Sequence, residues 1–372
     1  MPHERSLPPA RPASTARALL HASAFTVVFL AASVLVGRAL RQIPGATGDP
    51  TRRAVMLDRA FDRVRDEVDL VFLGSSRFYR GVNPRIFDKR VRNRGGEELA
   101  GLRSFNLSLN GMGMVESIER VRELLESNPA RLRWIVLELT DLDPVYLERN
   151  RMGPRMVAWH SARATIDALR VVWSTDRSLR SKFEESLAHL AEFGTRMSGR
   201  GAGPRAVLRL AGIESPFIDA PNFNGYETRE QQLAWGKAWK TAAGAGATRG
   251  AGDPDEEEAE RHRREVEERR ASAPKDLPPA HAAVLGELVE LCRTRGVEPI
   301  FVLAPVSGPN RLARIAQRAG VLPTLFAYNV PREHPELFQR ALFRDESHYN
   351  DDGARVFSRA LADDFLAWLG ER

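Results

Sequence analysis

The stretch that decides the fold is Val68–Phe78, which reads VDLVFLGSSRF. Its first six residues form an apolar run broken only by Asp69, a composition typical of a strand buried on both faces of a parallel sheet. Gly74 then allows a tight turn, so the sequence predicts that Ser75 and Ser76 are exposed where the strand ends. Backbone N–H groups at the start of a following helix favour a developing oxyanion, so this turn suits a nucleophilic serine.

Outward from this stretch, strands and helices alternate along the chain. Two segments, Met114–Ser127 and Ala280–Arg295, carry apolar residues at helical spacing. Further strands are expected at Ser104–Leu109, Arg133–Leu139, Glu298–Ala304 and Thr324–Asn329. This alternation predicts βαβ units, and therefore a three-layer α/β/α fold with a mostly parallel central sheet.

The functional residues of such a sheet gather beyond the carboxyl ends of its strands. Ser76 follows the first predicted strand, Gly111 follows the second, and Asp141 and Asp143 follow the third. Topology alone therefore predicts that these residues converge on one edge of the sheet.

A second informative stretch, Asp345–Gly353, reads DESHYNDDG and precedes an apolar helical pattern near the C-terminus. Asp345 stands three residues before His348, a spacing at which a carboxylate in a short turn can orient an imidazole for base catalysis. Together with Ser76 these residues would supply a nucleophile, a base and an orienting carboxylate. The alternative is a surface loop with a capping Asp345, and Asn350 and Asp352 are also candidates to cap the final helix.

The composition excludes several classes of protein. The 372 residues include 55 Lys and Arg against 49 Asp and Glu, and no nucleic-acid-binding signature accompanies this modest excess. The single cysteine, Cys292, excludes an intrachain disulfide and a cysteine-based zinc site. Gly111-Met-Gly113 lacks the third glycine of a dinucleotide fingerprint. We therefore expect no metal, no cofactor and no nucleic-acid partner.

An uncharged segment, Ala18–Gly37, is long enough to cross about 30 Å of hydrocarbon as a helix. We expect an uncleaved transmembrane signal anchor over residues 18–40, after a disordered tail, residues 1–17, that contains several prolines. The main alternative is a cleaved signal peptide, although the apolar region of such a peptide is usually shorter. Either interpretation places the main domain in the periplasm or outside the cell, and the first makes the chain a single-pass membrane protein.

The rest of the chain divides into an α/β domain and an insertion. A linker and helix, residues 41–66, lead into the α/β domain, which is expected as residues 67–145 and 276–372. Residues 146–275 form a largely helical insertion, with helices expected at Val157–Trp173 and Leu179–Met197. Within it, residues 241–270 are low in complexity and then densely charged, and form either a solvated helix or a disordered segment.

Three blocks, in this order, resemble motifs of the SGNH (GDSL-like) hydrolase superfamily, which is named for a Ser, a Gly, an Asn and a His. Gly74-Ser75-Ser76 is similar to its Gly-Asp-Ser block, and Asn106–Gly111 (NLSLNG) is similar to the block that ends in an oxyanion-hole glycine. Asp345–Gly353 resembles the final Asp-x-x-His block. The resemblance implies an SGNH/flavodoxin-like fold in which Ser76 is the nucleophile, His348 the base and Asp345 its orienting carboxylate.

The resemblance also implies an oxyanion hole formed by the backbone N–H groups of Ser76 and Gly111, with Asn110 as a further donor. Arg77 and Arg80, just after the serine, are the expected substrate contacts for an anionic ligand. The alternative for both arginines is a solvent-facing position at the start of a helix.

Two positions depart from the family pattern. Leu142 stands where the third block has an oxyanion asparagine, and loss of one such donor typically lowers the rate by ~10²–10³. Ser75 stands where the first block has Asp. Both departures are similar to a membrane-anchored branch of the superfamily, which includes proteins of alginate and other exopolysaccharide O-acetylation and the D-alanyl transfer protein of teichoic acids.

The resemblance to this branch implies a membrane-anchored serine esterase or O-acyltransferase. Its substrate would be an acyl ester, with acetyl as the expected group, of a cell-envelope or exported polysaccharide. A membrane-bound O-acyltransferase is the implied protein partner. The alternative from another class is a catalytically silent relative that binds glycan or serves as a scaffold in an acyltransferase complex.

Overall fold

The computed structural model describes residues 15–42, 52–140, 142, 153–199, 206–207, 210–211, 223–233, 276–307 and 310–372. The chain divides into two compact units, residues 1–47 with 194–213 and residues 48–193 with 214–372. Most of the predicted N-terminal tail, the segment 241–270, Asp141 and Asp143 lie outside the described residues.

The smaller unit contains the long apolar helix α1, Thr15–Arg41. Its segment Leu19–Leu40 is long and apolar enough to cross a membrane, and its apolar side chains are exposed. The helix begins at Thr15, within the tail that the sequence predicts as disordered. An N-terminal apolar helix of this kind is consistent with a membrane anchor or a signal sequence.

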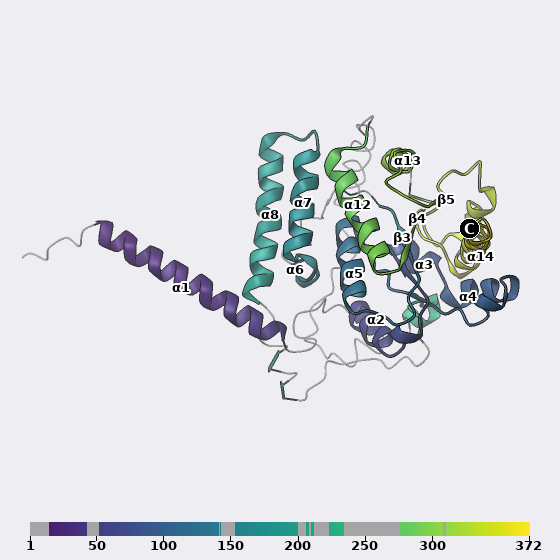
Figure 1. Ribbon diagram of the computed structural model, residues 1–372, viewed down its shortest axis with the longest axis horizontal. Coiled ribbons are helices and arrows are strands. Elements are labelled where there is room, and N and C mark those ends of the chain that lie inside the picture. Colours follow the sequence, from purple (N-terminus) through teal and green to yellow (C-terminus); the bar gives the residue numbers. More distant parts are fainter. Residues whose placement is uncertain are drawn as a thin grey trace, which may run out of the picture. The chain divides into compact units, whose positions relative to one another are not determined.

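The larger unit is built on a five-stranded sheet in which every pair of neighbours is parallel (Figure 1). The strands are β1 (Leu70–Leu73), β2 (Ser104–Asn106), β3 (Trp134–Glu138), β4 (Glu298–Leu303) and β5 (Leu325–Ala327). Their order is β2-β1-β3-β4-β5, so the chain winds outward to β2 and then returns past β1 to β3. The direction of winding reverses between β1 and β3, which is where doubly wound sheets bind their ligands.

Helices cover both faces of the sheet, which confirms the predicted three-layer α/β/α fold. Successive strand residues point to opposite faces, so Val71 and Leu73 pack in one apolar core and Leu70 and Phe72 in the other. The first core is covered by α2 (Arg52–Asp62), α5 (Met114–Glu126), α12 (Pro279–Thr294) and α13 (Arg311–Arg318). The second is covered by α3 (Ser76–Gly81), α4 (Pro84–Arg94) and α14 (Asp351–Gly370).

Short 3₁₀ turns complete the connections of the larger unit. They are η1 (Arg65–Glu67), η2 (Glu97–Leu99), η4 (Pro335–Leu337) and η5 (Arg340–Leu342). The last two lie in the segment that leads from β5 to the predicted catalytic Asp345.

The described part of the insertion begins with α6 (Pro154–Trp159), α7 (Ala162–Ser174) and α8 (Leu179–Ser198). The single helix predicted at Val157–Trp173 is therefore wrong. The helix breaks at His160 because the Ser161 side chain accepts a hydrogen bond from the Ala164 N–H and starts α7. Helix α7 packs against α5 and α12, where the buried pair Arg122 Nη2–Asp167 Oδ2 measures 2.6 Å.

Candidate active site

The turn after β1 places a serine at the first position of α3. Ser75 is the N-cap residue, and its Oγ accepts a hydrogen bond from the Arg77 N–H at 3.3 Å. Gly74 is required by the close approach of β3, because a Cβ at this position would lie 2.6 Å from Glu138 Cβ. The strand, the turn and the helix start are thus arranged as the sequence predicts, but the expected exposure of both serines is wrong. Ser75 is buried because it caps α3 and its N–H donates to the buried Glu138, and Ser76 is partly buried.

Ser76, His348 and Asp345 form a continuous hydrogen-bonded line. Ser76 Oγ lies 2.8 Å from His348 Nε2. On the other side of the ring, His348 Nδ1 lies 2.8 Å from Asp345 Oδ1 and 3.0 Å from Oδ2. A carboxylate at Nδ1 favours the tautomer with its proton there, which leaves Nε2 as the acceptor that faces the serine.

The loop that carries Asp345 and His348 is fixed by its own hydrogen bonds. Asp345 Oδ1 accepts from the backbone N–H groups of Ser347 at 3.0 Å and His348 at 2.9 Å. Burial raises the pKa of Asp345, but these hydrogen bonds and the neighbouring His348 outweigh it, so that the pKa lies below its usual value. The carboxylate is therefore ionised at neutral pH and available to hold the imidazole.

Helix α14 starts directly after this loop. Asn350 is its N-cap, because its Oδ1 accepts hydrogen bonds from the backbone N–H groups of Asp352 and Gly353, each at 3.0 Å. Asp352 lies in the first turn and pairs with Arg355 at 2.6 Å instead of capping. The cap fixes where the chain leaves the loop, and so fixes His348 relative to α14.

The predicted oxyanion residues lie on the loop that follows β2. This loop runs beside the end of β1, since the Leu107 N–H donates to Phe72 O at 2.8 Å and the Leu109 N–H donates to Gly74 O at 3.0 Å. Two residues further on, Gly111 has φ +67°, a left-handed conformation that glycine adopts without strain. Within the described part of the chain, no hydrogen bond uses the N–H of Ser76 or of Gly111.

The Asn106 side chain connects two segments of backbone that lead to the site. Its side chain is fully buried, and Nδ2 donates to the carbonyl oxygens of Phe78 at 3.0 Å and Val82 at 2.8 Å. Its Oδ1 accepts from the Ser108 N–H at 3.0 Å. Asn106 thereby ties the C-terminal end of α3 to the loop that carries Gly111.

Arg77, an expected substrate contact, is directed toward the protein. Its Nε lies 2.6 Å from Oε1 of Glu138, whose side chain is completely buried at the end of β3. Glu138 was not among the predicted site residues, although a glutamate inside the apolar run RWIVLEL is unusual and could have indicated a buried polar role. Arg80 Nη1 donates to Gln232 Oε1 at 3.3 Å.

Leu142 lies where the family resemblance implies an asparagine. It is buried and belongs to the core that α5 and α12 help to cover, and its side chain has no hydrogen-bond donor. The candidate donors in the described residues therefore remain the backbone N–H groups of Ser76 and Gly111, with Asn110, which is exposed, as the further predicted donor.

A segment of the insertion, residues 223–233, contacts several of the elements that carry the site and is called the strap below. Asn224 O accepts a hydrogen bond from the Asn106 N–H at 2.9 Å. Gly225 has φ +87°, and a Cβ there would lie 1.8 Å from Asn106 O, so only glycine fits. At the far side of the site, Tyr226 Oη donates to Asp351 Oδ1 at 2.8 Å, which connects the strap to the start of α14.

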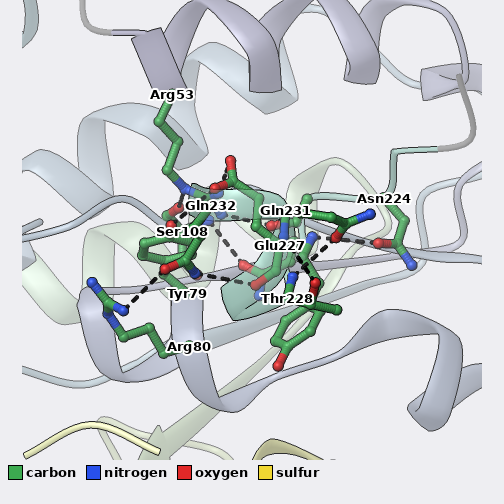
Figure 2. Close-up of polar contacts among 12 residues, drawn as sticks. Arg53, Tyr79, Arg80, Ser108, Asn224, Glu227, Thr228, Gln231 and Gln232 are labelled. Carbon is green, nitrogen blue, oxygen red and sulfur yellow. Dashed lines mark hydrogen bonds and ion pairs between the residues drawn. The ribbon is translucent and has the colours of Figure 1, made fainter. Parts of the chain in front are cut away.

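A buried polar cluster holds the strap to helix α3 (Figure 2). Arg53 of α2 donates to Gly225 O at 2.6 Å and pairs with Glu227 Oε1 at 3.0 Å. Tyr79 of α3 donates to Glu227 Oε2 at 3.2 Å, and the Arg53 guanidinium lies 3.4 Å from the centre of the Tyr79 ring. The strap therefore joins α2, β2, α3, which begins at Ser76, and α14, which begins three residues after His348.

Among the residues that the structure describes, no group of three His, Cys, Asp or Glu side chains is placed to hold a metal ion. In comparisons with known proteins, no family model, no curated protein and no solved structure matches this chain.

Proposed function

We propose that this chain is a membrane-anchored, SGNH-like serine esterase or O-acyltransferase. The observation that supports it most directly is the line Ser76 Oγ–His348 Nε2 at 2.8 Å and His348 Nδ1–Asp345 Oδ1 at 2.8 Å. This line stands at the carboxyl edge of a doubly wound parallel sheet, where such folds place their chemistry.

In the first half of the reaction, Ser76 Oγ attacks the acyl carbonyl carbon while His348 Nε2 takes the hydroxyl proton. The negative charge that develops on the carbonyl oxygen accepts hydrogen bonds from the N–H groups of Ser76 and Gly111. The ester C–O bond then breaks, and His348 returns the proton to the departing alcohol. Ser76 is left acylated.

In the second half, a hydroxyl group attacks the acyl-serine and gives its proton to His348. If that hydroxyl belongs to water, the acyl group leaves as a free acid and the protein is an esterase. If it belongs to a sugar, the acyl group forms a new ester and the protein is an acyltransferase. In both cases His348 returns the proton to Ser76 Oγ, and Asp345 stabilises the imidazolium in between.

The proposed substrate is an acyl ester, most simply acetyl, of a cell-envelope or exported polysaccharide. This part of the proposal is supported by the ordered motifs of the membrane-anchored branch and by the apolar helix α1. With α1 as a signal anchor, the α/β domain would work on the outer side of the membrane, beside a membrane-bound O-acyltransferase.

A fluorophosphonate probe tests the proposal, because it reacts covalently with an activated serine. We expect wild-type protein to be labelled at Ser76, and Ser76→Ala to lose both the label and about 10³-fold or more of p-nitrophenyl acetate hydrolysis. Ser75→Ala is the matched control, because the neighbouring hydroxyl caps α3 without facing His348, and it should keep the label. Absence of labelling in folded wild-type protein would overturn catalysis and leave the silent glycan-binding or scaffold role.

A further inference from the structure

Arg155, at the start of the insertion, reaches the loop that carries Gly111. From the first turn of α6, its Nη1 donates a hydrogen bond to the backbone carbonyl of Asn110. Its Nε and Nη2 donate to the two carboxylate oxygens of Glu116, each at 2.9 Å. All three guanidinium nitrogens are therefore engaged, on a side chain that is 22% exposed.

The contact with Asn110 bears directly on the Gly111 N–H. Asn110 C=O and Gly111 N–H belong to one planar trans peptide unit, so a donor that fixes the carbonyl also fixes the direction of the N–H. The backbone alone does not fix it, because Gly111 is a glycine with open space around its Cα. A hydrogen bond to the carbonyl also polarises the peptide and strengthens its N–H as a donor.

Glu116 connects this arrangement to the rigid part of the fold. It lies in the first turn of α5, its side chain is 6% exposed, and α5 packs on the sheet through Ile118 and Val121. A bidentate pair between arginine and carboxylate has a fixed planar geometry, which a lysine does not reproduce. Glu116 and Arg155 therefore leave the Asn110–Gly111 peptide little room to move relative to α5.

We propose that Arg155 is a positioning residue, which holds the Asn110–Gly111 peptide so that its N–H is presented as an oxyanion donor. The role at the oxyanion rests on the proposed function; the hold on the peptide does not. Since Leu142 supplies no donor, correct placement of Gly111 N–H decides how well the developing charge is stabilised. On this view the insertion is part of the active site through its first helix.

The test compares Arg155→Met with Arg90→Met in the full-length protein. Arg90 makes a similar bidentate pair with Asp363, at 2.8 Å for both bonds, between α4 and α14 and away from the Gly111 loop. Hydrogen–deuterium exchange should rise in residues 107–113 of Arg155→Met, where the Leu107 and Leu109 amides are hydrogen-bonded, and stay unchanged there in Arg90→Met.

Kinetics on p-nitrophenyl acetate supply the second readout. For Arg155→Met we expect kcat to fall by about 10²-fold with KM within about threefold, since the contact acts on the transition state. Arg155→Lys should recover about tenfold of the lost kcat, because its ammonium group can still donate to Asn110 O.

The two readouts separate the possible failures. Unchanged exchange in residues 107–113 of Arg155→Met would overturn the inference, and so would increased exchange with a wild-type kcat. If the fluorophosphonate does not label the wild-type protein and the protein does not hydrolyse p-nitrophenyl acetate, the proposed function fails. The hydrogen–deuterium exchange experiment still decides whether Arg155 holds the Asn110–Gly111 peptide.

Discussion

Glu138 supports the serine turn from below, because its Oε2 accepts a hydrogen bond from the Ser75 N–H at 2.6 Å. Its other oxygen pairs with Arg77 Nε at 2.6 Å. One fully buried carboxylate at the end of β3 thus holds both neighbours of Ser76, so the geometry of the nucleophile depends on the adjacent strand as well as on its own turn.

Glu138→Gln should therefore lower the free energy of unfolding by about 3 kcal/mol, since removal of one partner leaves a partly buried guanidinium without its counter-charge. Urea denaturation followed by circular dichroism measures the loss. The double variant Glu138→Gln/Arg77→Met should lose less than the sum of the two single variants. Glu184→Gln, which breaks an exposed pair with Arg180, is the control and should change stability by less than about 0.5 kcal/mol. Equal losses for the two glutamates would contradict the buried role.

Asp88 gives the fold a specific pH dependence. Burial raises the pKa of this carboxyl from 3.8 to about 7, although hydrogen bonds from Ser104 and the charge of Arg92 oppose the rise. Between about pH 4 and pH 7 the unfolded chain loses this proton while the folded protein keeps it, so stability falls as the pH rises through this interval.

Asp88→Asn removes the titration and preserves a neutral, hydrogen-bonding side chain. We expect the stability of the variant relative to wild type to rise by about 3 kcal/mol between pH 5 and pH 8. Urea unfolding at both pH values measures the change. Parallel pH profiles of stability for the two proteins would show that Asp88 does not cause the pH dependence.

If helix α1 is a signal anchor, as proposed, it should keep the chain in the membrane. An arginine at the centre of a spanning helix costs about 2.5–3.5 kcal/mol, whereas one near its end reaches the interface. Leu30→Arg should therefore reduce the fraction of full-length chain that stays in the membrane pellet after a carbonate wash, and Leu19→Arg, at an equally exposed position, should not. Mature chain that begins after residue 37 would show instead that the helix is a cleaved signal.

The sequence predicted the parts of this structure that short-range patterns determine. Apolar runs marked the five strands, and Gly74 followed by two serines marked the turn after β1. The approach of His348 to Ser76 was expected from the spacing of Asp345 and His348 and from the resemblance of Asp345–Gly353 to the final family block, and not from strand topology. Helices α4 and α13 were not anticipated, since their sequences are rich in arginine and carry few apolar residues.

The contacts that refine the site were not predictable in this way. Arg77 meets Glu138 across 61 residues, and Arg155 meets Asn110 across 45. Neither separation follows a helical or strand period. The sequence also contains many arginine and acidic residues, so no particular pair could be chosen from it. The strap is a similar case, because nothing in the residues around Gly225 indicates that they approach Asn106.

The hydrogen bond between Ser76 and His348 joins residues 272 positions apart, and this has a consequence for biosynthesis. The entropy cost of closing so long a loop grows only with the logarithm of its length, so packing of the 20-residue helix α14 on α3 and α4 can offset it. That helix follows all five strands in the chain order. A nascent chain that has not yet reached His348 therefore carries Ser76 without this imidazole beside it, and a chain that stops before residue 345 lacks two of the three residues of the Ser76–His348–Asp345 line.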